Sequence, residues 1–171
     1  MKKDKTVAQL FELAIHAEYL FEEMYEGLAR KFGHYPEVAD FWTVMSREER
    51  GHAHALKQIR DDLEAAQLQA PADPEVFAQA QAAQQIVVED TLARITNLQQ
   101  AYEIVSAYEN GETNAVFEFL ITRFSVEPGV SEFLRKQLGE HLMHLMRDFP
   151  EPFTTTARRR DVEALDLSDE G

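Results

Sequence analysis

The sequence has 171 residues, an apolar fraction of 44% and a formal net charge of −14. This length suffices for one domain with a sizeable core. The charge disfavours nucleic acids and anionic membranes as partners, because both bind basic surfaces. The absence of cysteine excludes disulfides, iron–sulfur clusters and zinc ribbons. Since the sequence shows no signal-peptide pattern and no apolar run near about 18 residues, we expect a soluble cytoplasmic protein.

Residues 6–32 carry apolar side chains at helical spacing and predict the first helix. Glu18 falls on the apolar stripe of this helix, four residues after Ala14 and three before Phe21. A carboxylate on a buried face needs a partner, because burying it unpaired is costly. Glu18 is therefore the first candidate for a functional residue.

The second helix is predicted to begin near Pro36, which suits a first turn, and to continue to about residue 68. Glu49 and His52 fall on its apolar face, whereas Trp42 and His54 are expected to point elsewhere. Positions three apart on a helix lie roughly 5–6 Å from each other, so a carboxylate and an imidazole at this spacing can bind one metal ion.

A Pro-containing break at residues 70–74 is followed by an Ala/Gln-rich stretch, for which we predict a crossover with one short helix capped by Asp73. A connection of this length allows the third helix to run parallel to the second. The third helix is predicted from Asn97, its N-cap, to about residue 124. Glu109 and Glu112 lie three apart near its centre, on either side of Gly111.

The fourth helix is predicted from Pro128 to about residue 148, with His141 and His144 on its inner face. Its inward apolar positions are Val130, Leu134, Leu138 and Leu145. No strand pattern competes along the chain. We therefore expect an all-α four-helix bundle over residues 1–149, with a long crossover between helices two and three, and a poorly ordered tail over residues 150–171.

Each of the four expected helices thus carries ligand-type residues near the middle of its buried face. Antiparallel packing would bring these midpoints to one level, where four carboxylates and three imidazoles would converge. Oxygen and imidazole ligands suit iron, manganese or zinc. The candidate metal ligands are Glu18, Glu49, His52, Glu109, Glu112, His141 and His144.

Over roughly residues 5–148, these motifs resemble the rubrerythrin branch of the ferritin-like superfamily. Glu18-x6-Tyr25 is similar to that family's first ligand and its tyrosine, and Arg-Glu-Glu49-Arg-Gly-His52 to its first Glu-x-x-His. Glu109-Asn-Gly-Glu112 is similar to its paired glutamates. The resemblance implies a ferritin-like bundle with two metal ions, iron first and zinc or manganese as alternatives.

Two departures from the family pattern bear on function. The fourth helix reads His141-Leu-Met-His144, so that His141 stands where the family has a glutamate bridging the two metals. A neutral imidazole coordinates one cation and brings no charge, so the site loses one bridge and one negative charge. The chain also lacks the four-cysteine rubredoxin module of rubrerythrins proper, so electrons must come from an external donor.

Three functions follow from this reading, in order of preference. The first is an oxidoreductase that reduces peroxide, or uses dioxygen or peroxide to oxidise ferrous iron; beyond the metal ligands it has no separate catalytic residue. The second is a non-catalytic protein that binds or buffers iron or zinc, which the His141 replacement favours. The third is a helical interaction module. A homodimer is expected, because the helices carry more apolar residues than one buried face accounts for, such as Phe41, Trp42 and Phe77.

Overall fold

The computed structural model describes residues 5–149, except for the side chains of residues 112 and 113. The described residues form eight helices, and their only β-pairing is an isolated bridge between Thr6 and Pro71. The all-α prediction is confirmed. The predicted tail, residues 150–171, lies outside the described part of the chain.

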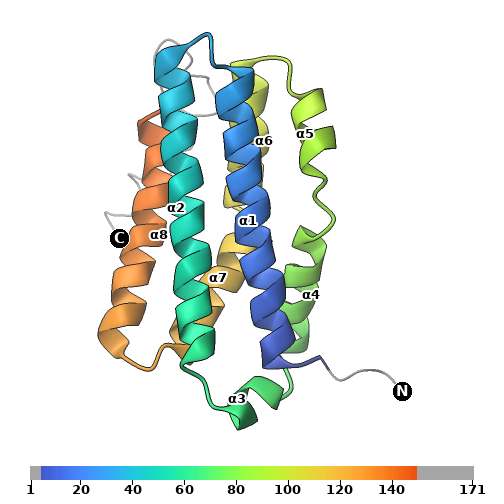
Figure 1. Ribbon diagram of the computed structural model, residues 1–171, viewed down its shortest axis with the longest axis vertical. Helices are drawn as coiled ribbons and strands as arrows, with labels where there is room; N and C mark the ends of the chain where they lie inside the picture. Colours follow the sequence, from blue (N-terminus) through green and yellow to red (C-terminus); the bar gives the residue numbers. More distant parts are fainter. Residues whose placement is uncertain (1–4, 150–171) are drawn as a thin grey trace, which may run out of the picture.

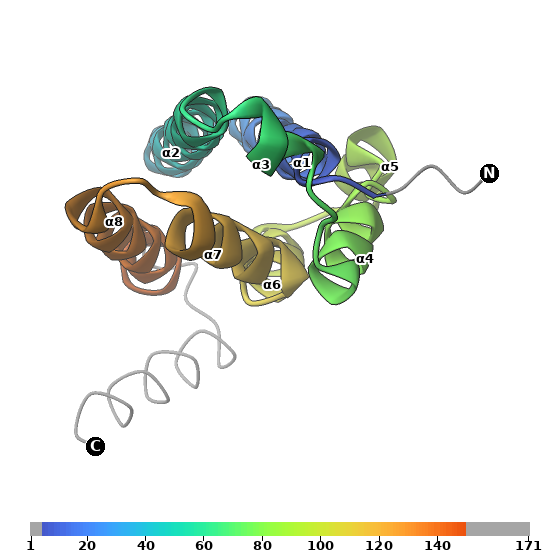
Figure 2. The same ribbon diagram turned by 90° about the horizontal axis from the view of Figure 1, so that it is seen from below.

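Four long rods make up the body of the molecule (Figure 1). Helices α1 (Val7–Lys31) and α2 (Pro36–Asp61) form one antiparallel hairpin. Helices α6 (Leu98–Glu109) and α7 (Glu112–Phe124) follow each other as the third rod, and α8 (Pro128–Arg147) is the fourth. Seen from below, α1 and α2 form one layer, and α6, α7 and α8 form the other (Figure 2).

The second helix ends at Asp61, short of the predicted residue 68, and the crossover that follows contains three short helices instead of the single one predicted. They are α3 (Ala65–Gln69), α4 (Pro74–Ala83) and α5 (Val88–Arg94). Asp73 caps α4, as expected, by accepting hydrogen bonds from the backbone N–H groups of Glu75 and Val76. The crossover runs alongside α1 to the end of the bundle where α2 begins. The third rod therefore runs in the same direction as α2 (Figure 1).

The predicted third helix is interrupted. Helix α6 ends at Glu109 and α7 begins at Glu112, with Asn110 and Gly111 forming a turn between them. The side-chain amide of Asn114 donates hydrogen bonds to both the backbone carbonyl and the carboxylate of Glu109. A Cβ at Gly111 would lie 3.1 Å from the carbonyl oxygen of Tyr108. Glycine therefore permits a close backbone approach at the break.

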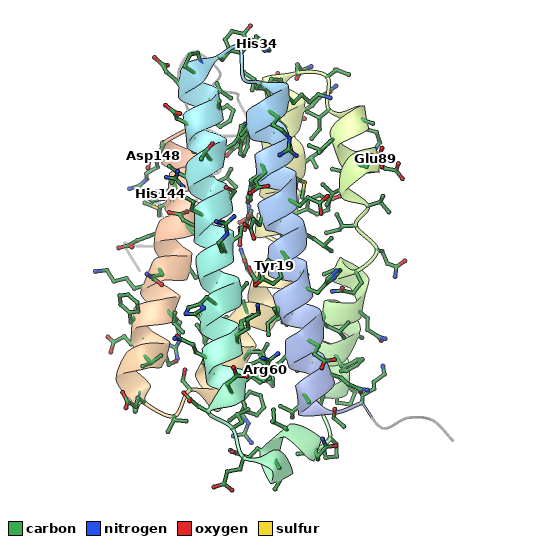
Figure 3. All side chains as sticks on the ribbon, in the orientation of Figure 1. Tyr19, His34, Arg60, Glu89, His144 and Asp148 are labelled. Atoms are coloured by element: carbon green, nitrogen blue, oxygen red, sulfur yellow. The ribbon has the colours of Figure 1, made fainter. Side chains whose placement is uncertain are left out.

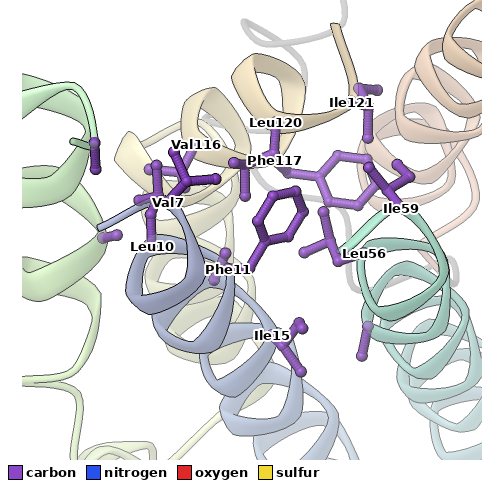
Figure 4. Packing of buried hydrophobic residues seen from close by; sticks show 14 of the residues in the cluster. Val7, Leu10, Phe11, Ile15, Leu56, Ile59, Val116, Phe117, Leu120 and Ile121 are labelled. Carbon is purple, nitrogen blue, oxygen red and sulfur yellow. The ribbon is translucent and has the colours of Figure 1, made fainter. Parts of the chain in front are cut away.

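The core consists of two apolar clusters at different heights in the bundle. The lower cluster includes Phe11, Leu56 and Phe117 (Figure 4), and the upper one includes Met24, Trp42 and Tyr102. Two sequence-based placements were wrong, since Trp42 is fully buried and Val130 is 41% exposed. In the described part of the chain, no helix combines the length and apolar character needed to cross a membrane.

Candidate metal centre

Between the two apolar clusters lies a layer of buried charged side chains, supplied by all four rods. Along α1 the lower cluster ends at Ile15 and the upper one starts at Phe21, and Glu18 lies between them. The same interval on α2 carries Glu49 and His52. The helical spacing that buries the apolar residues therefore also turns these polar residues inward.

Glu18, Glu49 and His52 form the first of two groups whose geometry suits a cation. One ligand atom from each residue lies within 4.8 Å of the others. His52 Nδ1 lies 3.1 Å from Glu49 Oε2 and 3.5 Å from Glu18 Oε2. All three side chains are almost fully buried, and His52 also lines a cavity between α2 and α8.

The second group consists of Glu49, Glu109 and His141, which meet the same 4.8 Å criterion. His141 Nε2 lies 2.9 Å from Glu49 Oε1 and 3.1 Å from Glu109 Oε1. Glu49 thus takes part in both groups, through different oxygen atoms. A carboxylate that offers one oxygen to each of two groups is suited to bridge two cations.

Without a cation, protons shared between the buried carboxylates and imidazoles stabilise this layer. Burial raises the pKa of Glu18 to about 8. Burial alone would lower the pKa of His52, but its hydrogen bonds with Glu18 and Glu49 outweigh that effect and raise the pKa to about 10. Burial likewise opposes charge on His141, yet the nearby carboxylates of Glu49 and Glu109 hold the pKa of this imidazole well above its ordinary value. The donors are therefore partly protonated at neutral pH, and a bound cation would displace these protons.

Glu48 is the site residue that sequence reasoning missed. Its two carboxylate oxygens each lie 2.7 Å from a histidine, one from His141 Nδ1 and the other from His144 Nδ1. Phe41, Met45, Glu48 and His52 follow one another at spacings of four, three and four, which places Glu48 on the inner face beside Glu49. This spacing could have identified Glu48 from the sequence. It was overlooked because the adjacent Glu49 forms the Glu-x-x-His motif with His52.

Five of the seven predicted ligands are brought together, namely Glu18, Glu49, His52, Glu109 and His141. His144 is not part of either group: its side chain is 40% exposed, its Nδ1 faces Glu48, and its Nε2 lies 3.8 Å from Asp148 Oδ2, which is labelled near it in Figure 3. The side chain of Glu112 lies outside the described residues, so its role remains a prediction.

Two aromatic side chains close the upper side of the second group. The Tyr25 hydroxyl donates a hydrogen bond to Glu109, as expected for a hydroxyl near the centre. Burial and the carboxylate charges raise the pKa of Tyr25 well above its usual range, so the phenol remains a donor. The ring of Tyr25 stacks on Trp42 at a centroid distance of 5.6 Å and an interplanar angle of 12°.

The donors present fit a pair of divalent transition-metal ions. The first ion would be held by Glu18, Glu49 and His52, and the second by Glu49, Glu109 and His141. Carboxylate oxygen and imidazole nitrogen suit iron, manganese and zinc. His141 is further prepared for this role, because its Nδ1 faces the Glu48 carboxylate while its Nε2 faces the cluster. Such carboxylate–histidine pairs orient metal-binding imidazoles in many proteins.

Fold and site together define an all-α protein with two linked carboxylate–histidine groups inside a bundle. The model of the Rubrerythrin family matches residues 9–127. The chain therefore belongs to this family. The match ends at residue 127, and α8, which carries His141 and His144, begins at the next residue. The comparisons with curated proteins and with solved structures gave no match.

The Glu48 contact makes a specific prediction about the second ion. Replacing Glu48 by Gln removes the negative charge that faces His141 Nδ1 and is expected to weaken binding at the second group by about 10- to 100-fold. Binding at the first group should change little, since the hydrogen bonds and ion pairs of Glu48 in the described residues are with His141 and His144, not with Glu18 or Glu49. Calorimetric titration of metal-free protein with Co(II) would resolve the two steps, and equal weakening of both would contradict the assignment.

Proposed function

We propose that this chain is a ferritin-like di-iron protein that reduces hydrogen peroxide. The observation that carries the proposal is the pair of buried carboxylate–histidine groups joined by Glu49, in a chain of the Rubrerythrin family. Two ferrous ions bound there would supply two electrons, so that one hydrogen peroxide and two protons give two waters. Oxidation of ferrous iron by dioxygen or peroxide is the related activity of the same site.

The residues of the chain contribute binding, orientation and exclusion of water. Glu18, Glu49 and Glu109 offset the charge of the cations, and His52 and His141 complete the donor set. The Glu48 carboxylate fixes the ring orientation of His141 through Nδ1. The Tyr25 hydroxyl donates a hydrogen bond to one carboxylate oxygen of Glu109. The apolar clusters above and below the layer exclude water from it.

A second candidate is a metal-buffering protein without turnover. It is favoured by the position of His141, whose two ring nitrogens are engaged by Glu48, Glu49 and Glu109. In this candidate, His141 takes the place of a bridging carboxylate and leaves the second ion more weakly held. The need for an external electron donor applies to the first candidate alone.

Metal analysis and peroxide consumption separate the two candidates. The full chain is loaded anaerobically with Fe(II), its iron content is measured, and hydrogen peroxide is added with and without an excess of a small-molecule reductant. Peroxidase function predicts two iron ions per chain and continued peroxide consumption as long as reductant lasts. A single stoichiometric oxidation that then stops favours buffering, and a folded chain that takes up no metal contradicts both.

The cytoplasmic location and the homodimer remain predictions. Fewer apolar residues are free for a dimer interface than the sequence suggested, because Trp42 and Phe77 are buried within the chain and Phe41 packs against Trp42. Large apolar side chains that are exposed in the described residues include Val126 and Phe133, at 72% and 58%.

A further inference from the structure

A cavity of about 350 Å³ opens between α2 and α8, on the side of the bundle that the crossover leaves uncovered. Helices α4 and α5 cover the opposite side, next to α1 and α6 (Figure 2). The residues lining the cavity are Val44, Arg47, Glu48, Gly51, His52, Gln137 and Glu140. One of them, His52, belongs to the first metal-binding group.

From this geometry, and resting on the proposed function, we infer that the cavity admits hydroperoxides to the metal centre and that it accepts organic hydroperoxides as well as hydrogen peroxide. A cavity of about 350 Å³ has room for several water-sized molecules. Hydrogen peroxide alone would not need that room. The polar groups of Arg47, Glu48 and Gln137 can accept or donate hydrogen bonds to the –OOH group, and Val44 offers an apolar contact for its substituent.

The two metal-binding groups differ in their access to this cavity. His52 forms part of its wall, whereas Glu109 and His141 do not line it. His141 is 1% exposed, and the stacked rings of Tyr25 and Trp42 lie above its group. A hydroperoxide in the cavity therefore meets His52 of the first group directly, whereas Glu48, which lines the same cavity, lies between it and His141 of the second group.

Gly51 supplies the means to test the cavity without altering the donors. Gly51 lines the cavity, and a Cβ built there has no heavy atom within 4 Å, so the wall has space for a larger side chain at this position. Replacing glycine by leucine in a helix also favours the helix. Gly139 on α8 has the same open surroundings but does not line the cavity, so Gly139→Leu is the matched control. Gln137→Phe fills the cavity from the opposite wall and serves as the second variant.

The first measurement needs neither iron nor turnover. Metal-free protein labelled with ¹⁵N is titrated with 2-phenyl-2-propanol, the alcohol that forms when cumene hydroperoxide is reduced. We expect amide shifts concentrated at residues 47–52 and 137–140 in the wild type and in Gly139→Leu, and their loss in Gly51→Leu and Gln137→Phe. Shifts located elsewhere, or none in the wild type, overturn the inference.

The second measurement follows oxidation of the ferrous protein in a single turnover, at equal iron content. Gly51→Leu is expected to lower the rate with cumene hydroperoxide by roughly tenfold or more, the effect of about 1.4 kcal/mol of added barrier. The rate with the smaller hydrogen peroxide should fall less, and Gly139→Leu should react like the wild type. If Gly51→Leu oxidises at the wild-type rate with both hydroperoxides, the cavity is not the entrance, although the proposed function stands. If the loaded wild type reacts with neither, the proposed function fails and the entrance with it.

Discussion

Replacing Glu49 by Gln is expected to abolish the binding of both metal ions, the largest effect of any single substitution in the centre. Glu49 Oε2 lies 3.1 Å from His52 Nδ1 in the first group, and Glu49 Oε1 lies 2.9 Å from His141 Nε2 in the second. A neutral amide brings no charge and binds divalent cations poorly. Metal content after loading with Fe(II) or Co(II) and desalting is expected to fall from two ions per chain to nearly none.

Single-group substitutions provide the controls. Glu18→Gln should remove the first ion only and Glu109→Gln the second only, because each residue belongs to one group. Glu140→Gln, an exposed carboxylate on α8, should leave the metal content unchanged. Circular dichroism would establish that each variant keeps its helical content. Retention of one ion by Glu49→Gln would show that the two groups are independent.

The metal-free protein is expected to lose stability steeply as the pH rises from 6 to 9. The pKa of Glu18 rises on folding from 4.5 to about 8, and that of His52 from 6.5 to about 10. Between the unfolded and the folded pKa, the folded state holds a proton that the unfolded state has released, so raising the pH favours unfolding. The pKa of Glu49 is lowered by folding, so its effect falls below pH 4.5 and does not oppose this trend.

Urea unfolding of the metal-free chain at a series of pH values would measure the decline. We expect a total of several kcal/mol, because each group contributes at most about 1.4 kcal/mol per pH unit. Glu18→Gln should make the slope between pH 6 and 8 shallower, since an amide does not titrate. Glu12→Gln, which removes an exposed carboxylate from the same helix, should leave it unchanged. A metal-free wild type whose stability is flat over this range would contradict the shifted pKa values.

Much of the fold could be predicted from helical periodicity. The first helix, the turn at Pro36, the capped helix at Asp73 and the N-cap at Asn97 all lie where the pattern placed them. The break at Asn110 and Gly111 was missed, because one glycine within a helical pattern is compatible with a continuous helix. At the break, Asn114 hydrogen-bonds to Glu109, a contact that the apolar pattern does not register.

The centre itself was less completely predictable. Spacing on the apolar stripe found the five residues that converge, because burial and helical phase both depend on it. The same argument could not tell that His144 contacts Glu48 and Asp148 and joins neither group, since a residue at the edge of a stripe can face either way. Glu48 lies on α2 and contacts two histidines of α8. Which of the adjacent carboxylates, Glu48 or Glu49, faces a given histidine depends on where α8 packs.

The division of the core into two apolar clusters separated by a charged layer has a consequence for the life of the protein before it acquires metal. In the metal-free chain, the two clusters would be joined by a layer in which buried carboxylates and imidazoles share protons. Metal binding would add stability at this middle level, so the metal-free chain is expected to be more open to proteolysis than the loaded one.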